Sequence, residues 1–189
     1  GIELECSKFD YAPNQQLLMA TGPGVIKLNN PETSEPTTEP GRFSLRKPCW
    51  AFLENFNTLK YFVQENRISA DAGSERLMIN YVPFVDGKYD EPITAAASRI
   101  EALLYETAEG QTELSALLAI GRIDYEDKDN QFLGSELFYD RESSIIKVKG
   151  DETAPCYYNG ALVDGVVYNL RTGKVEAKVV GPGSLQINR

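Results

Sequence analysis

The side chains that most often carry out catalysis are scarce in this chain. Its 189 residues include no histidine, which removes the commonest general base and the commonest metal ligand. Ser-His-Asp catalysis, Cys-His catalysis and histidine-based zinc sites are therefore excluded. The three cysteines, Cys6, Cys49 and Cys156, lie far apart and form no CxxC pair. One disulfide with one free thiol would fit them, and so would three buried thiols acting as small apolar residues.

Acidic side chains are the remaining candidates for chemistry. Asp124, Glu126, Asp127 and Asp129 cluster in one short stretch, and their oxygens could bind calcium. The stretch lacks the alternate-residue ligands and the terminal Glu of a calcium loop, so we interpret it as a solvated hairpin turn. Among the 28 acidic residues no spacing singles out a carboxylate pair for glycoside hydrolysis. The sequence therefore predicts a protein that is not an enzyme, with no catalytic residues, no metal and no cofactor.

The net charge and the apolar content limit the kinds of partner. A formal charge of −9 argues against nucleic acid, which needs clustered Lys and Arg, and against an anionic membrane surface. Apolar content of 42% is ordinary for a globular chain, and no apolar run is long enough to span a membrane. The chain begins at Gly1 within a strand-like pattern, which indicates an excised fragment whose signal or membrane anchor was removed.

Short runs of alternating polarity predict half-buried β-strands along most of the chain. The dipeptide Asn159-Gly160 is typical of a two-residue hairpin turn, and Asp86-Gly87, Asp164-Gly165 and Thr172-Gly173 indicate similar stops. Such spacing predicts an all-β fold. The alternating faces are Leu59, Tyr61 and Val63 in 58–64, Leu77, Ile79 and Tyr81 in 75–81, and Val175, Ala177 and Val179 in 173–180.

Two stretches depart from this pattern. Residues 93–120 are rich in Ala, Leu and Glu and could form helices, but Ile100, Ala102 and Leu104 alternate with other residues, so we favour strands. Residues 30–48 contain four prolines interleaved with Thr, Ser and Glu. Because proline donates no backbone hydrogen bond, we expect a long exposed loop there, with a domain boundary as the alternative.

A hairpin pattern recurs along the chain. Residues 11–22 align without gaps on 139–150, and a third copy with two extra residues runs over 168–181. In each copy a strand ends at Tyr, a polar turn follows, and a second strand closes at Gly. The first and third copies continue through Gly-Pro-Gly, which should force a bend between strands. Two explanations fit: one domain with related first and last strands, or a slice from a longer array.

These motifs resemble a known family. Gly121-Arg-Ile-Asp-Tyr125, Phe132-Leu-Gly134, Ile145-Ile-Lys-Val-Lys-Gly150, Asn159-Gly160-Ala161 and Thr94-Ala-Ala-Ala-Ser-Arg-Ile-Glu101 are similar to the OstA-like/LptA-like family. These are periplasmic β-jellyroll proteins of lipopolysaccharide transport, and they include LptC and the N-terminal part of LptD. The resemblance covers mainly residues 50–189, with the first 30 echoing the repeat.

The resemblance implies a single domain over 1–189, folded as an antiparallel β-jellyroll built from repeated hairpins. It implies a non-enzymatic role in outer-membrane biogenesis in the periplasm, in which an apolar interior holds lipid or lipopolysaccharide acyl chains. Members associate end to end through edge strands, so the implied partners are other OstA-like domains or a second copy. Trp50 and Phe52 are placed at the groove mouth. The implied groove residues are Leu59, Tyr61, Val63, Leu77, Ile79, Ile146, Val148, Val175 and Val179.

Other functions fit the same pattern. The inward residues could fill an ordinary closed core, and the β repeat would then be a structural or protein-interaction module of the cell envelope without a lipid. Trp50 and Phe52 could equally plug one end of that core. A carbohydrate-binding sandwich is a third hypothesis, and exposed aromatic residues on a flat face would be its sign.

Overall fold

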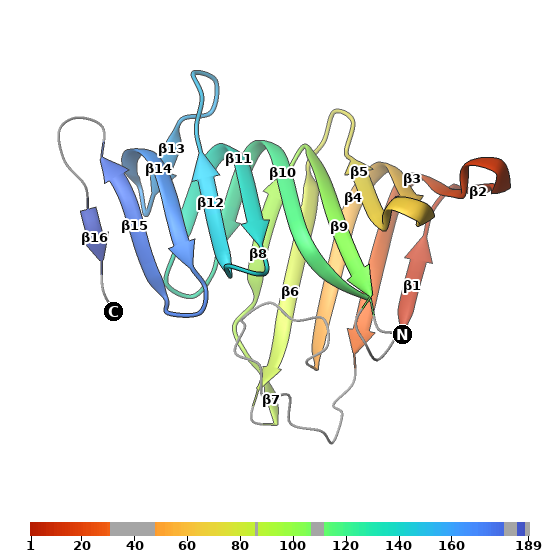
Figure 1. The fold of residues 1–189 in the computed structure, drawn as a ribbon, viewed down its shortest axis with the longest axis horizontal. Helices are drawn as coiled ribbons and strands as arrows, with labels where there is room; N and C mark the ends of the chain where they lie inside the picture. The colour runs from red at the N-terminus through yellow and green to blue at the C-terminus, as the bar shows by residue number, and fades with distance from the viewer. Residues whose placement is uncertain (31–47, 86, 107–111, 180–184, 188–189) are drawn as a thin grey trace.

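A computed structural model describes residues 1–30, 48–85, 87–106, 112–179 and 185–187, which form one antiparallel sheet of sixteen strands. β1 and β2 lie at one end of the sheet and β15 and β16 at the other (Figure 1). Two short 3-10 turns, η1 (Pro13–Gln15) and η2 (Val63–Glu65), interrupt the strands. The strands are β1 (Ile2–Glu5), β2 (Lys8–Ala12), β3 (Leu17–Asn30), β4 (Cys49–Phe62), β5 (Arg67–Asp71), β6 (Leu77–Val85), β7 (Lys88–Tyr89), β8 (Ile93–Ala97), β9 (Arg99–Glu106), β10 (Thr112–Glu126), β11 (Gln131–Asp140), β12 (Ile145–Lys149), β13 (Cys156–Tyr158), β14 (Ala161–Asn169), β15 (Lys174–Val179) and β16 (Leu185–Ile187).

The all-β class expected from the alternation is confirmed. In particular, the Ala-rich stretch 93–120 forms β8, β9 and most of β10, so the helical alternative was wrong there, apart from 107–111, which lie outside the described residues. Tertiary packing overrides the helix propensity of this stretch, because alternate residues face a shared core. Across the described ranges, no helix has the length and apolar character needed to cross a membrane.

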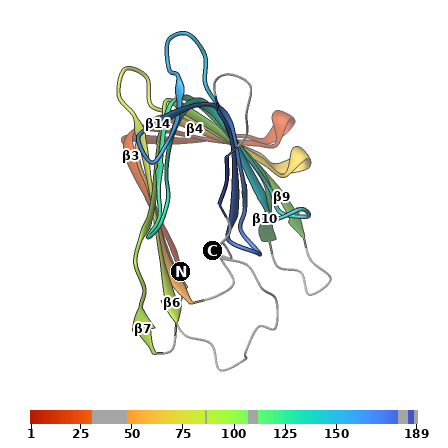
Figure 2. The ribbon, with the colours of Figure 1, turned by 90° about the vertical axis from the view of Figure 1, so that its left-hand side faces the viewer.

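The sheet is folded over along a crease that its long strands cross. Residues 49–54 of β4 pair with β6, whereas residues 58–62 of the same strand pair with β5. β3, β10, β11 and β14 change partners in the same way. Two walls result, and Figure 2 shows them meeting along the crease. We call them the β6 wall, which also contains β1, β8 and β13, and the β9 wall, which also contains β2, β5, β12 and β15.

Bulges and left-handed backbone mark the crease. The pairing register shifts at Thr21/Gly24 in β3 and at Val163/Gly165 in β14. In β10 it shifts across Gly121 and Arg122, whose φ angles are 80° and 49°. Extra residues of this kind bend a strand sharply while its neighbours stay paired. Gly-Pro-Gly at 22–24 therefore bends one continuous strand, and Asp164-Gly165, expected as a strand end, is a bend inside β14 instead. The second Gly-Pro-Gly, at 181–183, lies outside the described residues.

The repeated hairpin is confirmed, and the structure adds a copy that the sequence comparison missed. Four hairpins of the β9 wall share a four-residue turn, between Ala12 and Leu17, Phe62 and Arg67, Asp140 and Ile145, and Asn169 and Lys174. The last residue of each turn has a left-handed backbone conformation with positive φ: Gln16, Asn66, Ser144 and Gly173. The added copy begins at Tyr61. Its turn carries Asn where the others carry Gln, Ser or Gly, all of which this conformation admits.

The remaining turn predictions have mixed outcomes. Asn159 and Gly160 both have positive φ, at 46° and 81°, and Tyr158 pairs with Ala161, which confirms the two-residue hairpin. Asp86 lies outside the described residues. Residues 31–47, the main part of the expected Pro-rich loop, also lie outside the described residues. They connect β3 to β4, whose ends pair at Asn30 and Cys49.

A close contact at the crease joins β3 to β4. A Cβ built on Gly24 would lie 2.1 Å from a ring atom of Phe56, which is fully buried. Gly24 therefore leaves the space that the Phe56 ring occupies, and the ring fills the corner between the walls.

We predict that Gly24→Ala lowers the free energy of unfolding by about 1–3 kcal/mol, because a methyl group there must displace the Phe56 ring. Phe56→Ala alone should cost about 3–5 kcal/mol through the cavity it leaves. The double variant should cost less than the sum, by about 1 kcal/mol or more, since the smaller side chain removes the clash. Urea denaturation of the four proteins tests this, and additive costs would contradict the contact.

Candidate functional site

Two unbroken rows of side chains line the inside of the β9 wall, because each residue stands opposite the next across paired strands. The row beside the crease is Phe9, Ala20, Leu59, Ala70, Ile100, Ala119, Leu137, Val148, Val166 and Ala177. The row below it is Tyr11, Leu18, Tyr61, Ile68, Ala102, Leu117, Tyr139, Ile146, Tyr168 and Val175.

A matching row lines the inside of the β6 wall. It runs from Leu4 to Tyr158 in the same cross-strand fashion, and a parallel row begins at Ile2. Every member of these rows is apolar or tyrosine, whereas charged residues such as Lys27, Lys60 and Glu101 stand at alternate positions of the strands. The first row is Leu4, Ile26, Leu53, Ile79, Ala95, Tyr125, Phe132 and Tyr158, and the second is Ile2, Leu28, Ala51, Tyr81 and Ile93.

Burial along these rows is graded from one end of the sheet to the other. Toward β14 and β15 the side chains are almost completely buried, with Phe132 and Tyr168 at 0% exposure. Toward β3 and β4 the row members Leu18, Ile26 and Leu53 are only partly buried, whereas Ala20 beside the crease is 1% exposed. The rows then end on large side chains in water: Ile2 is 74% exposed, Tyr11 and Phe9 are 55% exposed and Leu4 is 39% exposed.

The buried end contains a polar centre. Asp127, only 7% exposed, lies in the turn between β10 and β11. Its Oδ1 accepts the backbone N–H groups of Asp129 and Asn130, both at 3.0 Å, and the Asn130 side-chain amide. Its Oδ2 accepts the hydroxyls of Tyr125 at 3.0 Å and Tyr168 at 3.2 Å. The acidic stretch is therefore not simply a solvated turn: one of its carboxylates is buried because hydrogen bonds replace its lost hydration.

Aromatic rings surround this carboxylate. The Phe132 ring stacks on Tyr125 with centroids 5.2 Å apart, and meets Tyr158 and Tyr168, each at 5.6 Å. Tyr158 also donates its hydroxyl to Asn130 Oδ1 at 3.2 Å. Since Tyr168 belongs to the β9 wall and the other rings to the β6 wall, these contacts join the two walls. We call Tyr125, Asp127, Phe132, Tyr158 and Tyr168 the aromatic stopper.

The structure divides the predicted groove residues into three groups. The first group, Leu59, Tyr61 and Ile79, lies in the partly buried interior. The second group lies outside it: Val63 is in the turn η2, and Val179 is 37% exposed at the end of β15. β4 ends at Phe62, so the expected strand over 58–64 is shorter than predicted. The fully buried group consists of Leu77, Ile146, Val148 and Val175.

Trp50 and Phe52 occupy the opposite face of β4 from Cys49, Ala51 and Leu53, which pack against the core. This corrects their expected position at the mouth of the interior, and equally the alternative of a core plug. A single residue of register decides the face of the sheet on which a side chain stands.

On the outer face, Trp50 contacts Phe52 and Tyr89, and Tyr89 contacts Phe84. The planes in these three contacts are inclined by 56°, 78° and 72°. Rings inclined so steeply offer no flat platform on which a sugar could stack.

Sequence reasoning missed the exposed end of the interior, formed by Ile2, Leu4, Phe9 and Tyr11. Its signal is the alternation within the first twelve residues, where these four alternate with Glu3, Glu5, Lys8 and Asp10. Alternation identifies the inward face of a strand, but it does not show whether another segment covers that face.

All three cysteines are free thiols, which agrees with the second of the two expectations, although Cys6 is only partly buried. Burial raises the pKa of Cys49 and of Cys156 to about 11, so both thiols stay neutral at pH 7. Neutral buried thiols act as apolar packing groups. Within the described ranges no group of three or more His, Cys, Asp or Glu side chains could hold a metal ion.

The strand order and the crease define the class of fold, a folded-over antiparallel β-jellyroll, as expected. Neither a protein-family model nor a curated protein matches the sequence. Among solved structures, the chain is similar to LptH of Pseudomonas aeruginosa, described as the LptA homologous periplasmic component of the conserved lipopolysaccharide transport device. The two chains are 13% identical, the match covers 80% of this chain and 83% of that one, and the TM-score is 0.47.

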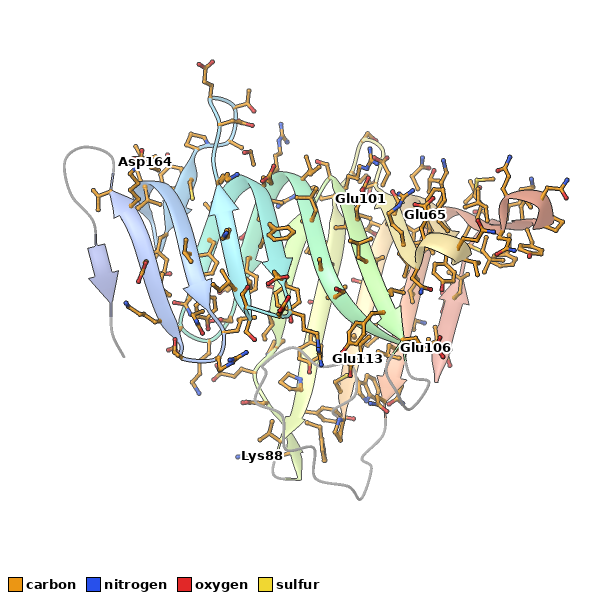
Figure 3. All side chains as sticks on the ribbon, viewed as in Figure 1. Glu65, Lys88, Glu101, Glu106, Glu113 and Asp164 are labelled. Atoms are coloured by element: carbon orange, nitrogen blue, oxygen red, sulfur yellow. The ribbon has the colours of Figure 1, made fainter. Side chains whose placement is uncertain are left out.

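We predict that Asp127→Leu, which puts a larger apolar side chain in place of the carboxylate and removes every acceptor, lowers the free energy of unfolding by roughly 2–4 kcal/mol. Two tyrosine hydroxyls and the N–H groups of the turn would lose their partner. Asp164, exposed where β14 crosses the crease (Figure 3), provides the matched control. Asp164→Leu should change the free energy by less than about 0.5 kcal/mol. Equal losses in the two variants, measured by urea denaturation, would contradict a structural role for Asp127.

Proposed function

We propose that this chain is a non-enzymatic, single-domain lipid-binding β-jellyroll of the periplasm, which holds acyl chains between its two walls. The observation that carries the proposal is the partly buried apolar interior at the β1–β4 end. Three of the expected groove residues, Leu59, Tyr61 and Ile79, stand there.

The energetics favour an alkyl occupant. The rows around Leu18, Ile26 and Leu53 leave apolar surface in contact with water, although both walls direct it inward. Each methylene that such a surface removes from water contributes about 0.8 kcal/mol. The members of these rows carry no charge, so an alkyl chain that binds there would not bury a charged side chain without a partner.

The lipid class follows from the resemblance of the sequence motifs to the OstA-like/LptA-like family, which points to lipopolysaccharide-type acyl chains in the cell envelope. The net charge of −9 makes an anionic headgroup an unfavourable neighbour. The apolar chains, rather than the headgroup, therefore supply the binding free energy in this proposal.

The same proposal includes association through edge strands. Gly1 and Asn29 exchange both backbone hydrogen bonds, so alternate pairs along β1 do the same. Ile2 and Leu4 lie between these pairs, and their N–H and C=O groups point away from β3. An edge of this kind can pair with a strand of another jellyroll domain or of a second copy.

We predict that the protein binds a dansylated fatty acid with roughly micromolar affinity, and that Ile79→Glu weakens this binding at least tenfold. The substitution places a charge on a partly exposed inward position, which burial of an alkyl chain would have to desolvate. Asn80→Glu adds the same charge to the adjacent, outward position of β6 and should leave the affinity unchanged. Fluorescence titration measures both variants.

Absence of binding by the unmodified protein, together with no lipid in mass spectra of protein purified from native envelopes, would refute the lipid function. The structural or protein-interaction module without a lipid would then be the better interpretation.

We predict further that Leu4→Pro reduces self-association more than Leu4→Ala does. Proline removes an N–H group from the free side of β1 without removing a bond to β3, whereas alanine only shortens the side chain. Sedimentation velocity over a range of protein concentrations compares the three proteins. Equal effects of the two substitutions would show that the backbone edge does not mediate the contact.

A further inference from the structure

The interior does not have the same cross-section along its length. At the aromatic stopper the walls touch directly: the ring of Phe132 from β11 meets that of Tyr168 from β14 edge to face, with centroids 5.6 Å apart, and both are fully buried. Rings in van der Waals contact leave no space for an alkyl chain between them.

Hydrogen bonds hold this contact closed from the far side. Asp127 lies in the β10–β11 turn, at the opposite end of the β6 wall from the crease, and accepts the hydroxyl of Tyr168 on the β9 wall. Val166, on the crease side of Tyr168, is 2% exposed. From the crease to the outer end of the walls, the cross-section at Tyr168 is therefore filled by protein atoms.

The other end of the interior differs in each of these respects. Leu53 and Ile79 on the β6 wall and Leu18 and Ile68 on the β9 wall are partly exposed. Beyond them the rows end on Ile2, Leu4, Phe9 and Tyr11, which are all exposed. The inward side chains are thus partly or fully exposed where β1 and β2 begin and completely buried where Phe132 of β11 meets Tyr168 of β14.

We infer that the aromatic stopper sets the length of alkyl chain that the interior accepts, and that a chain enters from the β1–β2 end and ends against Phe132 and Tyr168. The inference rests on the proposed lipid-binding function. It makes the interior a pocket with one entrance along its axis, in which Phe132 and Tyr168 determine specificity, rather than a passage through which a lipid runs from end to end.

The experiment is calorimetric titration with saturated fatty acids of increasing length. For the unmodified protein the affinity should rise about fourfold per methylene and then level off at one chain length. Phe132→Ala opens the stopper, so the plateau should move to chains longer by two methylenes or more. Phe138→Ala, the same substitution on the outward face of the same strand, should leave the plateau where it is.

A second measurement does not depend on a variant that folds. A fatty acid with a photoreactive diazirine at its methyl end should form adducts on Tyr125, Phe132 or Tyr168 of the unmodified protein. Adducts on β15, at Val175 or Ala177, would overturn the inference, as would a plateau that Phe132→Ala leaves unchanged. In both of those outcomes lipid still binds, so they leave the proposed function standing. Failure of every fatty acid to bind would refute the proposed function itself, and the inference with it.

Discussion

The architecture depends on the way five long strands bend without losing their partners. β3, β4, β10, β11 and β14 each cross the crease, and the sheet stays continuous because bulges and left-handed residues absorb the change of direction. The Gly24–Phe56 contact shows this constraint, since any side chain at Gly24 would occupy the position of the ring. Without this bend the apolar rows of the two walls would face water.

The crease also explains why the interior is graded. The walls share one line of attachment, so the side chains that span the space farther from it decide how far each section closes. At one end Phe132, Tyr168 and Asp127 fill that space with rings and hydrogen bonds. At the other end shorter aliphatic side chains such as Leu53 and Ile79 stand on the equivalent rows and remain partly exposed. At the stopper, closure thus involves both aromatic packing and polar pairing between the walls.

Much of the fold was predictable because it follows from local sequence patterns. Alternation identified the strands and their inward faces, and the Tyr-to-Gly hairpin located three of the four similar hairpins of the β9 wall. The errors have causes that lie outside the local sequence. Asp164-Gly165 has the composition of a turn but bends a continuous strand, because its neighbours keep their pairing on both sides. Trp50 and Phe52 were expected at the groove mouth but stand on the outer face, because strand partners distant in sequence decide which face of β4 turns inward.

The sequence by itself determined the absence of histidine chemistry, the period-two faces and the turns, all of which depend on residue type and near neighbours. Only the tertiary structure decided which inward faces close. Tyr61 and Tyr168 stand on one row of one wall, yet Tyr61 is partly exposed and donates to Asn66, five residues away. Tyr168 is fully buried and donates to Asp127, 41 residues away. Burial depends on what the opposite wall supplies at each point, and no local pattern carries that information.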